Sequence, residues 1–201
     1  DDLVSQGKIL HPAVSNFAAW QITKALGISR QEGLAPFACI QPMYNLVKRQ
    51  AEVEILPLAQ SEGLAVIPYS PLGGGLLTGK YGPEQRPDSG RLVENEMYIT
   101  RYGEDWYFKA ADRFSELARD RDYVPASLAV AWVSAHPAVT APIIGARNVE
   151  QLEDSLASVE IDMTPELYQE ITSLSPTPPP ATDRSEEKTS FTYDNKLTQK
   201  K

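Results

Sequence analysis

Residues 64–81 read LAVIPYSPLGGGLLTGKY, and this stretch determines most of what can be predicted about the fold. The apolar, partly β-branched run at 65–67 indicates a buried strand that ends at Tyr69 and Ser70. Three consecutive glycines then form a turn, where the backbone can approach a ligand closely and present N–H groups to phosphate oxygens. With Lys80 following as a positive charge, the stretch indicates a dinucleotide site, although a strand leaving through a flexible turn explains these residues equally well.

Three other stretches share this pattern of an apolar run that ends in polar side chains. They are HPAVSN at 11–16, FACIQPMYN at 37–45 and TAPIIGAR at 140–147. Val14, Ile40 and Val66 follow one another at intervals of 26 positions, and helical patterns that stop at Gly33 and Gly63 fill the gaps. This period predicts the βα repeat of a parallel sheet. The polar residues at the strand ends are therefore expected to gather at the ligand-binding edge of that sheet.

The third interval is longer, because Val66 and Ile143 are 77 positions apart. Residues 82–105 are rich in Gly, Pro and charge, which predicts a long excursion over the strand ends. Helices are predicted at 106–119 and 125–135.

Two further helices are predicted near the end of the chain. Asn148 and Thr164 are interpreted as their capping residues, and Leu152, Leu156 and Val159 as the buried face of the first. After position 175 the composition changes to Pro and charged residues, which indicates an extended or disordered tail.

Composition restricts the classes of partner and compartment. The 201-residue chain is 42% hydrophobic and has a formal net charge of −8, which disfavours nucleic acid and anionic membranes as partners. Cys39 is the single cysteine, so an intramolecular disulfide is excluded and a buried, inert thiol is expected. No apolar run approaches the ~18 residues of a membrane span. The opening DDLVSQGK is neither a signal nor a transit peptide, so a cytoplasmic protein is expected.

Four motifs resemble the aldo-keto reductases in order and spacing, with the closest likeness to the bacterial and channel-subunit branch. They are VSNF at 14–17, QPMYN at 41–45, IPYSPLGGGLLTGKY at 67–81 and PIIGARNVEQLEDSL at 142–156. The resemblance implies an α/β fold, the parallel (β/α)8 TIM barrel, of which this chain supplies roughly strands 5 to 8 and their helices. Residues 1–175 would then form the second half of the barrel, with a long inserted loop at 82–105, and residues 176–201 a Pro-rich, charged C-terminal tail.

The resemblance also implies a site for a nicotinamide cofactor. Ser15, Asn16 and Gln41 would hold the nicotinamide carboxamide, since amide side chains supply both donors and acceptors. The ring of Tyr69 would stack on the nicotinamide. The residues that would wrap the pyrophosphate are Ser70, Pro71, Leu72, Gly73, Gly74, Lys80 and Arg91.

The last part of the implied site lies where a predicted strand ends at Gly145 and a helix begins after Asn148. Free N–H groups and the positive end of the helix dipole would face one point there, beside the planar fork of Arg147. This combination favours a 2′-phosphate, and therefore NADP(H) over NAD(H). The implied adenine contacts are Gln151, Asp154 and Ser155, the last two replacing the family's usual Glu-Asn pair.

No catalytic residue and no metal site are predicted in this chain. The family's catalytic Asp, Tyr, Lys and His lie on its first four strands, and His11 and His136 are interpreted as structural or surface histidines. A four-stranded sheet with open edges has three explanations: part of a full barrel, a half-barrel that pairs with another copy or chain, or a pseudo-enzyme. The first is favoured.

The sequence therefore predicts the cofactor half of an NADP(H)-dependent oxidoreductase that reduces an aldehyde or ketone by hydride transfer. Its partners would be a small carbonyl substrate and the missing N-terminal half-barrel, and an oligomer is compatible with it. The alternative is a nucleotide-sensing regulatory subunit in the manner of the potassium-channel β-subunits. A third interpretation is a (β/α)8 enzyme with a phosphate ligand unrelated to nicotinamide.

Overall fold

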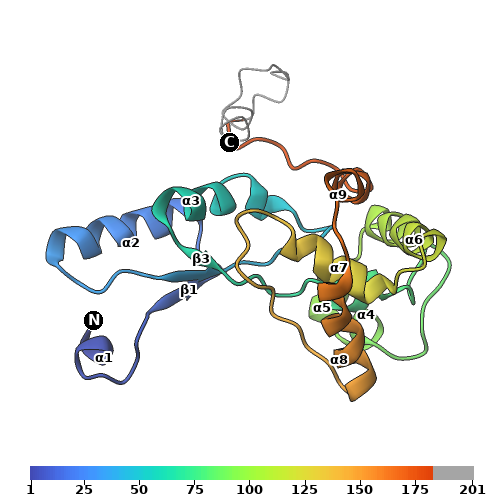
Figure 1. Cartoon of the computed structure of the whole chain (residues 1–201), viewed down its shortest axis with the longest axis horizontal. Helices are drawn as coiled ribbons and strands as arrows, with labels where there is room; N and C mark the ends of the chain where they lie inside the picture. Colours follow the sequence, from blue (N-terminus) through green and yellow to red (C-terminus); the bar gives the residue numbers. More distant parts are fainter. Residues whose placement is uncertain (183–201) are drawn as a thin grey trace.

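The computed structural model describes residues 1–182, which form a small parallel sheet with helices along one face and a further group of helices beyond its end (Figure 1). The strands are β1 (Ala13–Ser15), β2 (Cys39–Gln41) and β3 (Ala65–Val66). The α-helices are α1 (Asp2–Ser5), α2 (Ala19–Glu32), α3 (Ile55–Glu62), α4 (Arg91–Glu94), α5 (Glu96–Arg101), α6 (Asp105–Asp120), α7 (Pro125–Ser134), α8 (Val149–Leu156) and α9 (Pro165–Thr172). Short 3-10 helices are η1 (Gln50–Glu52), η2 (Gly73–Thr78) and η3 (Ala157–Glu160).

The sheet confirms the predicted βα repeat. Its strand order is β1-β2-β3 with both pairs parallel, and Ile40 is in register with Val14 on one side and Val66 on the other. The 26-residue period therefore corresponds to one strand-to-strand step. The intervening helices α2 and α3 end at Gly33 and Gly63, both left-handed, as predicted for helix stops.

The fourth predicted strand is not formed. Residues 141–146 carry no helix or strand, although this segment runs beside β3. The N–H of Thr140 donates to the Val66 carbonyl at 2.8 Å, and that of Ile143 donates to the Pro68 carbonyl at 2.8 Å. The N–H of Ala141 also donates to the Val66 carbonyl at 3.3 Å, but the N–H that would return a bond to the Ala141 carbonyl belongs to position 68, and Pro68 has none, so the segment and β3 cannot form a regular ladder.

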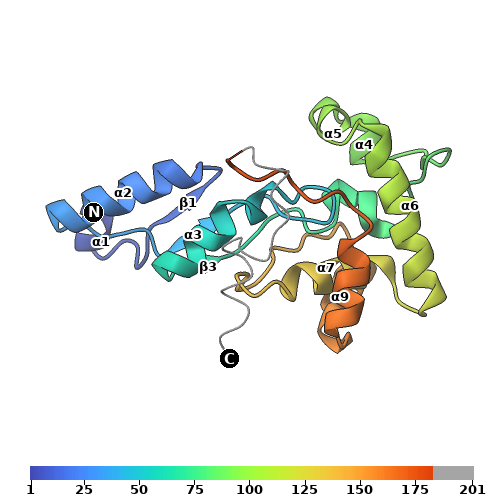
Figure 2. The same ribbon diagram turned by 90° about the horizontal axis from the view of Figure 1, so that it is seen from above.

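Helices α2 and α3 lie along one face of the sheet (Figures 1 and 2). Side chains alternate along a strand, so Val14, Ile40 and Val66 are buried under these helices while the intervening residues face the other side. Cys39 is one of the latter and is half-buried, so the prediction of a buried thiol is wrong. Partial burial still raises the pKa of its thiol above the ordinary value.

Helices α4 to α9 form a second packed group (Figure 1), in which the predicted helices at 106–119 and 125–135 are confirmed as α6 and α7. Phe114 of α6, Trp132 of α7 and Ile171 of α9 are buried there. The Trp132 indole stacks between the rings of Tyr44 and Tyr168, with centroid distances of 5.3 and 5.6 Å. This stack joins the second group to the loop that follows β2.

A buried ion pair makes a second connection between the β2 loop and the end of α9. The Arg49 guanidinium donates to both carboxylate oxygens of Glu52, at 2.8 and 2.9 Å. Its Nη1 also donates to the carbonyls of Thr172 and Ser175 and to the Ser175 hydroxyl. The pair thus fixes the chain at the point where α9 ends.

Both predicted capping residues are confirmed, but the predicted buried face of α8 is wrong. The Asn148 side chain accepts a hydrogen bond from the Gln151 N–H, and Thr164 accepts one from the Leu167 N–H. The apolar side chains expected to be buried are instead exposed: Leu152 (39%), Leu156 (51%) and Val159 (81%). Helix α8 packs on α7 through its small, buried Ser155 instead.

The segment at 82–105 is more structured than a loop, because it contains α4 and α5 and ends at the first residue of α6. Residues 176–182 carry no helix or strand, and residues 183–201 of the predicted tail lie outside the described residues. Within residues 1–182, no helix is long and apolar enough to cross a membrane.

Candidate functional site

A cavity of about 370 Å³ lies at the carboxyl end of β3, between the glycine turn, the inserted segment and the start of α8. Its walls come from four parts of the chain that are distant in sequence. The predicted cofactor residues that line it are Tyr69, Ser70, Pro71, Leu72, Gly74, Lys80, Arg91, Gly145, Arg147, Gln151 and Asp154.

The turn that forms one wall has an unusual backbone. Ser70 has a φ of +59°, and Gly73, Gly74 and Gly75 follow with φ of +58°, +70° and +103°. This left-handed region costs a residue with a side chain roughly 1–2 kcal/mol, whereas glycine adopts it freely. A Cβ on Gly74 would also lie 2.6 Å from the Tyr98 ring, so this position requires glycine on both grounds.

Three cationic side chains face the cavity. Burial lowers the pKa of the Lys80 ammonium from its ordinary 10.5, and the neighbouring charges of Arg147 and Arg91 lower it further. None of the three forms an ion pair within residues 1–182. A cluster of positive groups that repel one another without a carboxylate partner is a site prepared for an anion.

The aromatic ring of Tyr98 positions Arg91 at the cavity. Arg91 is the first residue of α4, and its guanidinium lies 5.4 Å from the centroid of the Tyr98 ring. Its Nη1 also donates to the Tyr98 hydroxyl at 3.4 Å. Stacking of this kind limits the directions in which the charge can point.

The start of α8 supplies backbone donors on the opposite wall. Its N-cap Asn148 occupies one N–H, and the Gln151 side-chain oxygen accepts from the Arg147 N–H at 3.1 Å. The Gln151 amide is therefore partly committed to capping, which leaves its NH2 group for a ligand.

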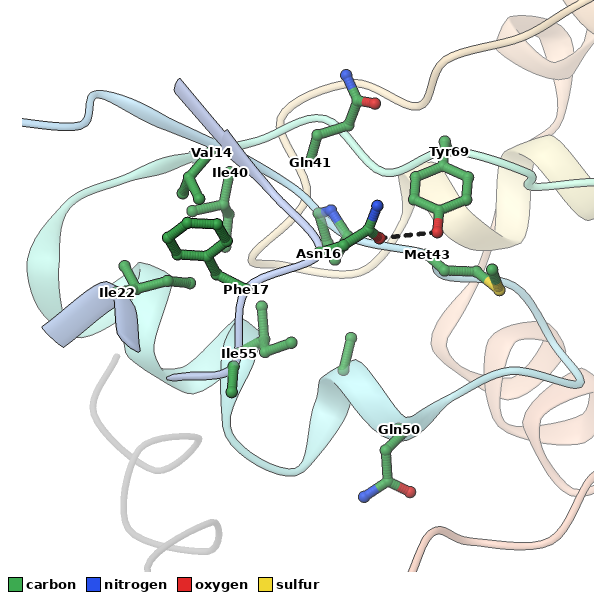
Figure 3. A pocket seen from close by; sticks show the side chains of 13 residues that line it. Val14, Asn16, Phe17, Ile22, Ile40, Gln41, Met43, Gln50, Ile55 and Tyr69 are labelled. Carbon is green, nitrogen blue, oxygen red and sulfur yellow. Dashed lines mark hydrogen bonds between the residues drawn. The ribbon is translucent and has the colours of Figure 1, made fainter. Parts of the chain in front are cut away.

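A second cavity, of about 320 Å³, lies at the carboxyl ends of β1 and β2 (Figure 3). The predicted residues Asn16 and Gln41 line it, and Tyr69 lines both cavities. Figure 3 shows the Tyr69 hydroxyl directed at the Asn16 side chain, to which it donates a hydrogen bond of 2.8 Å. Asn16 itself has a φ of +58°, so its side chain leaves the strand end in an uncommon direction.

Three residues of the predicted site line neither cavity. The Ser15 hydroxyl donates to the Gln41 carbonyl at 2.9 Å and so joins two strand ends. Gly73 is buried beside Tyr102. Ser155 is 1% exposed and donates to the Gln151 carbonyl, so its predicted adenine contact has no geometric support.

Other lining residues were missed by the sequence reasoning. Gly75 and Thr78 belong to the same turn, where the Thr78 hydroxyl donates to the Gly75 carbonyl at 2.7 Å. The glycine run was the available signal for both. Val124 and Ala126, at the start of α7, also line the cavity, and nothing in their local sequence distinguishes them.

Neither histidine lines either cavity. His11 is exposed, and the His136 imidazole packs edge-on against the Tyr44 ring at a centroid distance of 5.5 Å. Burial lowers the pKa of His136, so this ring is neutral near pH 7 and serves as a packing residue.

Comparison with known proteins relates this arrangement to a family. The family model described as "Aldo/keto reductase family" matches residues 1–176. The chain is 36% identical over 178 residues to "Uncharacterized oxidoreductase YrpG" of Bacillus subtilis (strain 168), covering 87% of this chain and 52% of the relative. It is 30% identical over 174 residues to "Versiconal hemiacetal acetate reductase" of Aspergillus parasiticus, covering 84% and 49%.

A third relative is "Aldo-keto reductase" of Babesia bovis, 33% identical over 179 residues that cover 86% of this chain and 63% of the relative. The chain thus spans about half the length of the curated relatives that it matches. Because the family model covers most of the chain, including the strands and both cavities, the chain belongs to the aldo/keto reductase family.

Proposed function

We propose that this chain binds NADP(H) and forms the cofactor-binding part of an oxidoreductase that reduces aldehydes or ketones. The observation that carries the proposal is the convergence of Lys80, Arg91 and Arg147 on one cavity that has Tyr69 in its wall. A phosphorylated dinucleotide brings several negative charges to such a cavity, together with a flat ring for the aromatic side chain.

The proposed phosphate contacts divide between the two walls. Lys80 and Arg91 would hold the pyrophosphate against the turn at 70–75, whose backbone approaches closely at its glycines. Arg147 would take the 2′-phosphate beside the first N–H groups of α8. A 2′-phosphate is what distinguishes NADP(H) from NAD(H), so this contact would determine the choice of cofactor.

The proposed nicotinamide contacts are Tyr69, which lines both cavities, and two amides at the ends of β1 and β2. Tyr69 would present its ring to the nicotinamide and fix which face is open to the substrate. The amides of Asn16 and Gln41, at the carboxyl ends of β1 and β2, would orient the carboxamide.

When bound, NADPH supplies the hydride for carbonyl reduction. The proton donor would come from residues beyond this chain. Among the described residues near the cavities, no general acid lies beside a lysine that would lower its pKa and a histidine that would orient it. General acid catalysis contributes roughly 10²–10⁴-fold to such a reaction. We also propose that β1, β2, β3 and the segment at 140–144 correspond to strands 5 to 8 of an eight-stranded barrel.

Fluorescence titration of the natural full-length polypeptide with NADPH and with NADH tests the proposal. Saturable binding of NADPH in preference to NADH, together with NADPH-dependent turnover of an aldehyde panel, is expected. Binding of neither nucleotide would contradict the cofactor assignment. NADPH binding with no turnover of any carbonyl would favour the regulatory alternative.

A further inference from the structure

Asn45 is a buried amide that the proposed cofactor contacts do not use. It follows β2 in the loop at 42–49 and is completely buried. Its Nδ2 donates to the Ser70 carbonyl at 2.9 Å and to the Tyr102 hydroxyl at 3.2 Å, while its Oδ1 accepts from the Val47 N–H at 3.1 Å. The Asn45 amide therefore donates to two segments of the larger cavity. One contains Ser70, which lines the cavity, and the other contains Tyr102, which supports the lining.

The first of these bonds holds the strained residue of the turn. The left-handed residues of the turn are Ser70 and three glycines, so Ser70 is the one that has a side chain. Its carbonyl also accepts a hydrogen bond from the Gly73 N–H at 2.9 Å. An L-residue relaxes out of this conformation unless its surroundings fix it. A rotation at Ser70 would swing its carbonyl away from Asn45 and re-aim the Tyr69 ring and the glycine N–H groups together.

The second bond reaches the inserted segment. Tyr102 ends α5, is completely buried, and stacks on Tyr98 with ring centroids 6.5 Å apart. The Tyr98 ring in turn contacts the Arg91 guanidinium, which also donates to the Tyr98 hydroxyl. The Asn45 amide thus contacts the turn directly, and it is linked to Arg91 through the rings of Tyr102 and Tyr98.

We propose that Asn45 is the positioning residue of the cofactor site: it holds Ser70 in its left-handed conformation and keeps the turn in register with the segment that carries Arg91. The inference rests on the proposed function for its link to NADP(H). The holding of the turn itself does not depend on any ligand.

The test is a cycle of variants in the natural full-length polypeptide: wild type, Asn45→Ala, Ser70→Gly and the double variant. Glycine is comfortable at a φ of +59°, so Ser70→Gly removes the need for the restraint without restoring the bond. Asn45→Ala should raise the Kd for NADPH about tenfold, the scale of one lost buried hydrogen bond with its unpaired partner. In the Ser70→Gly background the same change should raise it by less than about threefold.

Hydrogen exchange of the ligand-free protein supplies a readout that needs no cofactor. Asn45→Ala should accelerate amide exchange in a peptide covering 69–77, and Ser70→Gly should remove most of that difference. Tyr102→Phe, which breaks the second bond and the long donation of the hydroxyl to Met43 Sδ but keeps the Ser70 bond, should accelerate exchange at 91–101 and leave 69–77 unchanged. Ser115→Ala, which removes a buried hydrogen bond within α6, is the matched control and should change neither peptide.

Several outcomes would overturn the inference. Equal losses of NADPH affinity in both backgrounds, or unchanged exchange at 69–77 in Asn45→Ala, would mean that Asn45 does not hold the turn. If Asn45→Ala does not fold, Asn45→Asp keeps the volume and the Val47 contact and is compared in the same cycle. If wild type binds no nicotinamide nucleotide, the proposed function is wrong, while the exchange data still decide the role of Asn45.

Discussion

The Tyr69 hydroxyl donates a 2.8 Å hydrogen bond to Oδ1 of Asn16, a residue 53 positions earlier in the chain. Because this oxygen is engaged as an acceptor, the NH2 group of Asn16 is left to face outward as a donor. The aromatic ring beyond β3 and the amide beyond β1 therefore have a fixed relative orientation before any ligand arrives.

Changing Tyr69 to Phe separates the hydroxyl from the ring. Tyr69→Phe should weaken NADPH binding by roughly three- to tenfold, because it removes one hydrogen bond and frees the Asn16 amide to turn. Tyr69→Ala, which also removes the stacking surface, should weaken it further. Isothermal calorimetry measures both, with Tyr123→Phe as the control outside either cavity. Equal affinities for the Phe variant and wild type would show that the hydroxyl does not contribute.

Arg147 is expected to choose between the two nicotinamide cofactors. Arg147→Gln should reduce NADPH affinity about ten- to a hundredfold, since a charge-assisted phosphate contact contributes roughly 1.5–3 kcal/mol. NADH, which lacks the 2′-phosphate, should lose less than about threefold. Arg121→Gln, which removes an exposed partner of Glu170, controls for the loss of a surface charge. A similar loss for both cofactors would contradict the assignment.

Lys80 should make cofactor binding depend on alkaline pH. Its pKa is lowered below 10.5, so its charge is complete at low pH and disappears sooner than that of an exposed lysine as the pH rises. NADPH affinity should therefore be constant below that pKa and fall as the pH passes through it. A bound phosphate favours the charged form, so binding should take up protons in this range.

The Lys80→Arg variant supplies the comparison for this pH dependence, because a guanidinium stays charged throughout. Its affinity profile should be flat from about pH 7 to pH 10, and its binding should release or take up no protons from this site. Calorimetry in two buffers of different ionisation enthalpy measures the uptake. A fall in affinity that persists unchanged in Lys80→Arg would place the titrating group elsewhere.

The buried Arg49–Glu52 pair should contribute more to folding than an exposed pair. Arg49→Met removes the guanidinium that donates to the Glu52 carboxylate and to two carbonyls at the end of α9, and should lower the free energy of unfolding by about 3 kcal/mol. Arg30→Ala breaks a pair whose arginine side chain is 74% exposed, and should cost less than about 1 kcal/mol. Urea unfolding compares the two, and equal effects would contradict the expectation.

The sequence predicted the repeating core well, because strand period, helix stops and caps are local signals. The spacing of Val14, Ile40 and Val66 corresponds to strand register, and Gly33 and Gly63 end helices as expected. Ile143 did not follow as a strand residue, because Pro68 lacks the N–H that a regular pairing between β3 and this segment needs.

Other features depended on tertiary contacts that periodicity does not contain. The apolar stripe of α8 was assigned to the core, whereas the helix turns the small Ser155 toward α7. The mutual repulsion of Lys80 and Arg147 and the central position of Asn45 arise only when distant segments meet. Motif resemblance supplied most of the residues that line the larger cavity, and it supplied no information about Val124 or Ala126.

The three cations at the larger cavity belong to three separate stretches of chain: the end of the glycine turn, α4 and the residue before the α8 cap. None of them shares a backbone hydrogen bond with another, so each can be exchanged while the other two keep their places. The site is modular in this respect. If Arg147 contacts the 2′-phosphate as proposed, a single codon change at that position would alter the cofactor preference and leave the sequence of the glycine turn unchanged.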